Sequence, residues 1–89
     1  MKYNDSYLLD IDLKLQDILY SSTFITRKAN RASRLALSFE NNGGTKEDLS
    51  MIEENLGIIE RHLLRNLQAV KDCKSSLQLL KEENCFMDK

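Results

Sequence analysis

Two uninterrupted heptad rows of mainly small and apolar residues constrain the fold of this chain most strongly. The first row comprises Leu8, Ile11, Leu15, Ile18, Ser22, Ile25, Ala29, Ala32, Ala36 and Phe39. The second row comprises Leu49, Ile52, Leu56, Ile59, Leu63, Asn66, Val70, Cys73, Leu77 and Leu80. Alternating steps of three and four residues place side chains on one face of an α-helix. The rows therefore predict two long helices, each with one apolar seam.

The segment between the two rows favours a reversal of the chain. Residues 41–44 read Asn-Asn-Gly-Gly, and these residue types tolerate the positive φ that a helix C-terminus and a tight turn require. Thr45 is a natural N-cap, and Asp48 can complete a capping box with it. We expect one domain over residues 1–89, with a helix at about 5–40, a turn at about 41–45, a second helix at about 46–83 and a frayed C-terminal tail.

Folding the chain back at this turn pairs positions whose numbers add up to 88. The alignment sets small residues against large ones, as in Ala32 with Leu56, which suits closely packed antiparallel helices. It also places Ser22 opposite Asn66 within the seam. A buried asparagine disfavours slipped alignments, because its amide would lose its partner. The sequence thus predicts an all-α, antiparallel, coiled-coil-like two-helix hairpin in which Ser22 and Asn66 set the register, the alternative being a local solvated gap.

Further apolar residues flank the two rows and have no place in a two-helix seam. They are candidate partner-binding residues, namely Leu9, Leu13, Leu19, Tyr20, Phe24, Leu35, Leu37, Ile58, Leu64, Leu67 and Leu79. Side rows of this kind typically pack against further helices. We expect the hairpin to complete a three- or four-helix bundle, either as a homo-oligomer or with other proteins. The alternative is that these residues are scattered, exposed apolar side chains.

Arginines gather in the middle of the predicted hairpin. Arg27, Arg31 and Arg34 share one outward stripe of the first helix, and the alignment brings Arg61 and Arg65 near it. This patch could bind an acidic partner or a phosphate backbone, or it could be a solvated face balanced by neighbouring glutamates. The net charge of −1 and the absence of a basic loop with stacking aromatic residues argue against nucleic-acid binding.

Catalytic chemistry has little support in this sequence. His62 is the single histidine and has no cysteine or carboxylate at metal-ligand spacing. Cys73 falls in the second row and Cys85 in the tail, roughly 18 Å apart on one helix and too far for a disulfide, so both are expected as thiols. We therefore expect no enzyme activity, no cofactor and no metal.

The longest uninterrupted apolar runs are far too short to span a bilayer, and the first residues lack the apolar stretch of a signal peptide. We expect no membrane insertion and a cytoplasmic location, or a nuclear one in a eukaryote. The sequence predicts a non-catalytic protein–protein interaction module, a scaffold or adaptor subunit of a larger complex. The alternatives are a small escort chaperone or co-chaperone that covers a partner helix and, with less support, a nucleic-acid-associated regulator that uses the arginine stripe.

Overall fold

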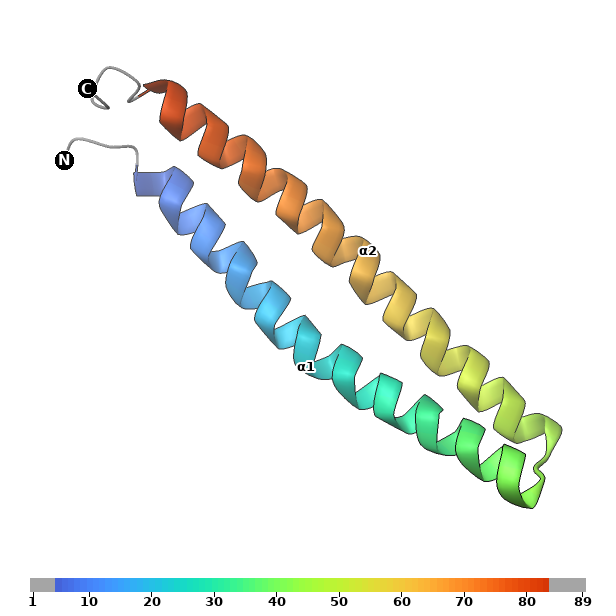
Figure 1. Cartoon of the computed structure of the whole chain (residues 1–89). Coiled ribbons are helices and arrows are strands. Elements are labelled where there is room, and N and C mark those ends of the chain that lie inside the picture. The colour runs from blue at the N-terminus through green and yellow to red at the C-terminus, as the bar shows by residue number, and fades with distance from the viewer. Residues whose placement is uncertain (1–4, 84–89) are drawn as a thin grey trace.

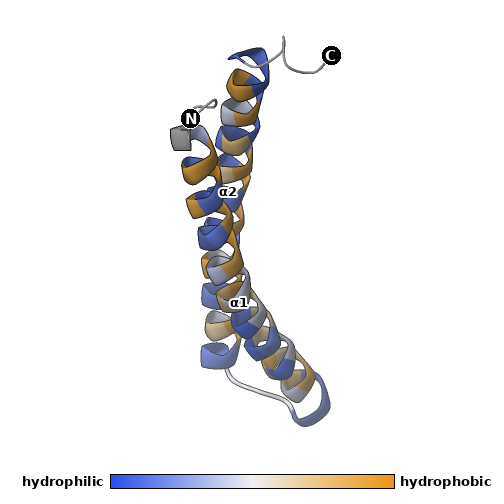
Figure 2. Cartoon of the chain, turned by 90° about the vertical axis from the view of Figure 1, so that its left-hand side faces the viewer, coloured by the Kyte–Doolittle hydropathy of each residue, from blue (hydrophilic) through white to orange (hydrophobic). Residues whose placement is uncertain are grey.

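The chain folds into two long antiparallel helices joined by a short turn. The computed structural model describes residues 5–83, which form α1 (Asp5–Asn42) and α2 (Lys46–Glu83). The start of α1 and the end of α2 lie at the same end of the molecule (Figure 1). The principal extents are 64 × 20 × 15 Å, and the radius of gyration is 19.9 Å, against about 12 Å for a compact chain of this length. The predicted all-α hairpin is confirmed, and it is elongated and curved along its length (Figure 2).

The helix boundaries agree closely with those expected, except that α1 extends two residues further, to Asn42. Residues 20–23 read Tyr-Ser-Ser-Thr, which are weak helix formers, but they do not interrupt α1. The hydroxyl of Thr23 donates to the carbonyl of Leu19 at 3.4 Å. Near the start of α1, Lys14 Nζ lies 2.7 Å from Asp10 Oδ1, and this carboxylate raises the pKa of Lys14. The predicted C-terminal tail, with Cys85, lies outside the described residues.

The turn is built as the sequence predicts. Gly43 has a φ of 74°, and its amide donates to the carbonyl of Phe39 at 2.9 Å, which closes the last turn of α1. A Cβ at Gly44 would overlap the Phe39 ring. At the start of α2, the amide of Asp48 donates to Thr45 Oγ1 at 3.2 Å, and the amide of Thr45 donates to Asp48 Oδ2 at 3.1 Å. This reciprocal pair is the predicted capping box.

Each predicted heptad row is confirmed at every second position only. The confirmed members are buried or half-buried: Ile11, Ile18, Ile25, Ala32 and Phe39 of α1, with Ile52, Ile59, Asn66, Cys73 and Leu80 of α2. The remaining members of both rows are exposed. In each helix, a neighbouring heptad column, which is a set of residues spaced seven positions apart, is buried or half-buried instead. These columns comprise Tyr7, Lys14, Ser21, Lys28 and Leu35 of α1, with Asp48, Asn55, His62, Ala69 and Ser76 of α2. Each helix is therefore rotated about its own axis relative to the predicted orientation, so that half of each row faces the other helix and half faces solvent.

Contacts between the helices show an alignment a few positions away from the predicted one. Ser21 Oγ and His62 Nδ1 are hydrogen-bonded at 3.1 Å. Further along, Cys73 Sγ lies 3.9 Å from the carbonyl oxygen of Ile11. The residue numbers in these two pairs add up to 83 and 84, rather than 88.

The predicted layer of Ser22 opposite Asn66 is wrong. Ser22 is exposed, Asn66 is half-buried, and Ser21 is the serine buried between the helices. The physical reason is the rotation of the helices, which turns the heptad column of Ser22 toward solvent. The buried asparagine of α2 is Asn55, which is 5% exposed and donates from its side-chain amide to the carbonyl of Met51 at 2.8 Å.

The hairpin encloses very little apolar volume. Within residues 5–83, Ala32 is the only hydrophobic residue that is buried, and no side chain is below 2% exposed. Large apolar residues are half exposed along the whole length of both helices. The helices therefore pack against each other over a narrow strip and leave most apolar side chains accessible.

Candidate partner-binding surfaces

One side of the hairpin carries the exposed members of both heptad rows, and we call it the leucine face. Its large residues are between 42% and 55% exposed and comprise Leu8, Leu15, Leu49, Leu56, Leu63, Val70 and Leu77. The α2 column of this face has five apolar residues in succession, without a polar interruption. In the α1 column, Ser22, Ala29 and Ala36 follow the two leucines. The side chains of this column are therefore large near the open end of the hairpin and small near the turn.

A groove of about 240 Å³ shows that the two columns share one side of the molecule. The walls come from α1 at Leu8 and Leu15 and from α2 at Val70 and Leu77. Ile11 and Cys73 lie between them, and Lys74 borders the groove. Its lining is almost entirely apolar, which is typical of a groove that receives a side chain or a helix of a partner.

The opposite edge of the interhelical seam is polar, and its groups are paired within the hairpin. Besides the bond to Ser21, the His62 ring meets the Phe24 ring edge-on, with centroids 5.0 Å apart. Lys28 Nζ lies 5.3 Å from the centroid of the same Phe24 ring, within range of a cation–π contact. Among the described residues, no buried side-chain nitrogen or oxygen lacks a hydrogen-bond partner. In the middle of the hairpin, the polar side chains of this edge are therefore paired within one chain, whereas the leucine face is open.

The exposed surface is larger than that of a compact monomer. The accessible area is 7023 Å² for a chain of 10.3 kDa, whereas a compact monomer of this mass exposes about 5,400 Å². One partner contributes about 800 Å² to a standard protein–protein interface, a small part of this accessible area. The hairpin thus has ample surface for a stable interface.

Most of the flanking residues predicted to bind partners are exposed, as expected. These residues are Leu9, Leu13, Leu19, Tyr20, Phe24, Leu37, Leu64, Leu67 and Leu79. Leu35 and Ile58 are half-buried, and Phe24 also contacts His62 within the hairpin. Exposure alone does not group these residues, because they point in several directions around both helices. The heptad pattern does not predict the leucine face, because it places these residues in the seam between the two helices.

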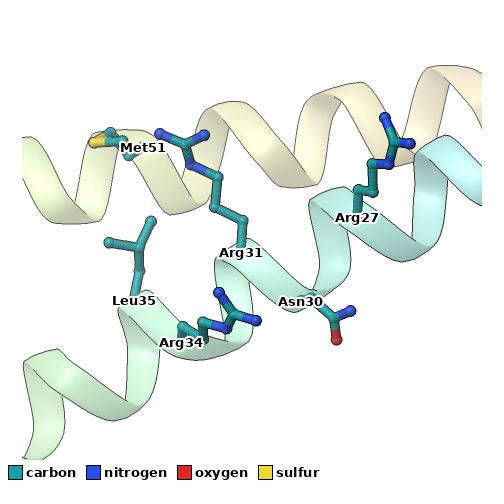
Figure 3. Close-up of a pocket in the computed structure, with 6 residues that line it drawn as sticks. All are labelled: Arg27, Asn30, Arg31, Arg34, Leu35 and Met51. Atoms are coloured by element: carbon teal, nitrogen blue, oxygen red, sulfur yellow. The ribbon is translucent and has the colours of Figure 1, made fainter.

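The predicted arginine patch is only partly assembled. Arg27, Arg31 and Arg34 line a groove of about 490 Å³ with Asn30, Leu35 and Met51. Figure 3 shows Arg31 and Leu35 extending from α1 toward α2 near Met51, while Asn30 points away.

Neither of the two arginines of α2 lines this groove. Arg65 lines a separate groove with His62 and Asn66. Arg61 precedes half-buried His62 by one residue, so it points about 100° away from it around the helix. The groove beside α1 therefore gathers three of the five predicted arginines.

No helix within residues 5–83 is long and apolar enough to cross a membrane. Comparison of the chain with protein-family models, with curated proteins and with solved structures finds no match.

Proposed function

We propose that this chain is a non-catalytic protein–protein interaction module, a scaffold or adaptor subunit whose hairpin packs into a larger helical assembly. The observation that carries this proposal is the leucine face. Burying the exposed half of a leucine side chain contributes about 1 kcal/mol, so the seven large residues of this face together offer several kcal/mol to a partner. A contiguous apolar stripe along two helices is typical of a surface that packs against further helices.

The chemistry of the two edges supports the same proposal. The polar edge resembles the border of a helix–helix contact, where charged and polar side chains meet between neighbouring helices. The apolar edge has the composition of a bundle interior. A helical partner laid on this edge would place the leucines in a core and leave the polar edge as it is.

An escort chaperone is the second candidate function, and the apolar groove beside Val70 favours it, since a groove of this kind can hold an amphipathic helix. The two functions differ in lifetime. A scaffold subunit forms a stable stoichiometric complex, whereas a chaperone binds transiently a protein that aggregates when alone. The dissociation rate of the purified complex separates them.

A face-specific variant tests the proposed function. We would compare the tagged chain with Leu63→Asp, on the leucine face, and with Leu64→Asp, a residue that is 60% exposed but points away from this face. The proposed function predicts that Leu63→Asp loses the proteins captured by the unmodified chain and that Leu64→Asp keeps them. Equal capture by both variants would refute a binding role for the leucine face. Circular dichroism checks that both variants remain helical.

A further inference from the structure

We propose that the leucine face is covered by a second copy of this chain, related to the first by a two-fold axis parallel to the long axis of the hairpin. The resulting four-helix bundle has both turns at the same end. This inference rests on the proposed function, since it names the partner that the leucine face packs against. Three observations carry it: the area left exposed, the residue sizes along the face and the charges along its borders.

The symmetry fixes the alignment of the two copies. A two-fold axis along the hairpin leaves the height of every residue unchanged, so α1 of one copy faces α2 of the other at the alignment found within one chain. Within the chain, contacting residue numbers add up to 83 for Ser21 with His62, to 84 for Ile11 with Cys73 and to 86 for Phe24 with His62. Cross-copy neighbours must therefore have numbers that add up to about 85. One copy cannot be shifted along the other without breaking this symmetry. Unfavourable residue pairs at this alignment would therefore argue against the arrangement.

The sizes of the side chains on the leucine face agree with this alignment. The small residues Ser22, Ala29 and Ala36 of α1 fall opposite the large residues of the partner copy's α2. The cross-copy pairs are Ser22 with Leu63, Ala29 with Leu56 and Ala36 with Leu49, followed toward the open end by Leu15 with Val70 and Leu8 with Leu77. Small residues against large ones allow the helices to approach closely over the half of the bundle next to the turn.

The borders of the leucine face match in charge at the same alignment. The next heptad column of α1 contains Asp12, Leu19, Thr26, Ser33 and Glu40, and that of α2 contains Lys46, Glu53, Glu60, Leu67 and Lys74. Facing residues whose numbers add up to 86 are Asp12 with Lys74 and Glu40 with Lys46, both of opposite charge.

The two leucines of these borders also meet each other at this alignment. Leu19 and Leu67 are 69% and 51% exposed in the hairpin, and the second copy brings them together. The two remaining pairs set the hydroxyls of Thr26 and Ser33 against glutamates, so no like charges face each other. Charges at such border positions select partner and orientation in helical bundles.

The opposite orientation, with the turns at opposite ends, fits less well. It would set α1 against α1 of the second copy, and the border column of α1 holds the carboxylates Asp12 and Glu40 but no cation. The border column of α2 continues to Lys81, and an alignment that sets Lys46 opposite Lys81 of the second copy also sets Glu53 opposite Lys74, so this side combines like and opposite charges. The charges therefore favour the arrangement with both turns together.

Charge exchange in the full-length chain tests this proposal by sedimentation equilibrium. We expect a dimer of twice the 10.3 kDa chain mass. Lys74→Asp and Asp12→Lys should each weaken dimerisation about tenfold, since each replaces two symmetry-related attractive contacts by repulsive ones. The double variant should restore the affinity to within about threefold of the unmodified chain, because opposite charges again face each other. Lys71→Asp, with the same change of charge on the outer side of α2, is the matched control and should leave the affinity unchanged.

A distance measurement distinguishes the two orientations without charge variants. A spin label at Asn41→Cys, in a chain with Cys73→Ala and Cys85→Ser, should give one intermolecular distance below about 30 Å, the width of a four-helix bundle. A distance of about 55 Å, close to the length of a 38-residue helix, would overturn the arrangement. Monomers at every concentration would also overturn it. Loss of partner capture by Leu63→Asp would then still support the proposed function, with a different protein as the partner.

Discussion

Oγ of Ser21 on α1 lies 3.1 Å from Nδ1 of His62 on α2, and this hydrogen bond joins the middle parts of the two helices. A hydroxyl both donates and accepts, so Ser21 can pair with His62 whether or not Nδ1 carries a hydrogen. Ser21 is 9% exposed, whereas the next residue, Ser22, lies on the leucine face. Two adjacent serines thus lie on different sides of the hairpin, Ser21 on the polar edge and Ser22 on the leucine face.

Replacing these serines should have opposite effects on stability. Ser21→Ala should lower the free energy of unfolding by about 1 kcal/mol, since it removes the bond to His62. Ser22→Ala should leave it unchanged or raise it slightly, because alanine is the better helix former. Urea unfolding of both variants at one fixed chain concentration measures the difference. A larger loss for Ser22→Ala would show that the helices are rotated the other way.

The capping box predicts a local effect at the start of α2. Thr45→Ala removes the hydroxyl that accepts from the amide of Asp48, and we expect a loss of about 1 kcal/mol in the free energy of unfolding. Ser50→Ala, at an exposed position within the same helix, is the control and should be neutral or slightly stabilising. Equal losses for the two variants would contradict the N-cap role of Thr45.

Two glycines should respond to alanine with opposite signs. Gly43 has a φ of 74°, which alanine adopts at a cost, so Gly43→Ala should destabilise the chain by about 1 kcal/mol. Gly57 lies within α2, and a Cβ there meets no atom within 4 Å, so Gly57→Ala should stabilise the chain by about 0.5–1 kcal/mol. Thermal unfolding measures both changes. A loss of stability at Gly57 would indicate that a partner helix packs closely against this position.

The sequence predicts both helices, the turn, the capping box and half of each heptad row. These features depend on local propensities and on periodicity, which act within a few residues. Periodicity also places Ile18 and Ile59 in the seam. Their columns lie between the two columns on either side, so a small rotation of the helix in either direction leaves them close to the other helix. The boundaries at Asn42 and Lys46 follow from the turn residues between them.

The direction in which each row points could not be predicted, and this is why Ser22 and Leu63 were misplaced. Neighbouring columns of a heptad lie about 50° apart around the helix. A row that spans two columns can therefore point directly at one neighbouring helix, or it can point between helices at the middle of a bundle. The choice depends on the number of helices in the assembly, which is not encoded locally. The hairpin buries the polar column of Ser21 and exposes that of Ser22, as expected for a row aimed at the interior of a larger bundle.

The most direct test of the leucine face as a buried interface is thiol labelling of the protein in the cells that produce it. In a chain with Cys73→Ala and Cys85→Ser, the rates of modification of Leu63→Cys and Leu64→Cys are compared before and after denaturation. The two side chains are 53% and 60% exposed in the hairpin, so an uncovered hairpin would label at similar rates. We expect native Leu63→Cys to be protected at least about tenfold relative to Leu64→Cys, because a residue buried in a packed interface is shielded from the reagent. Equal native rates would contradict it.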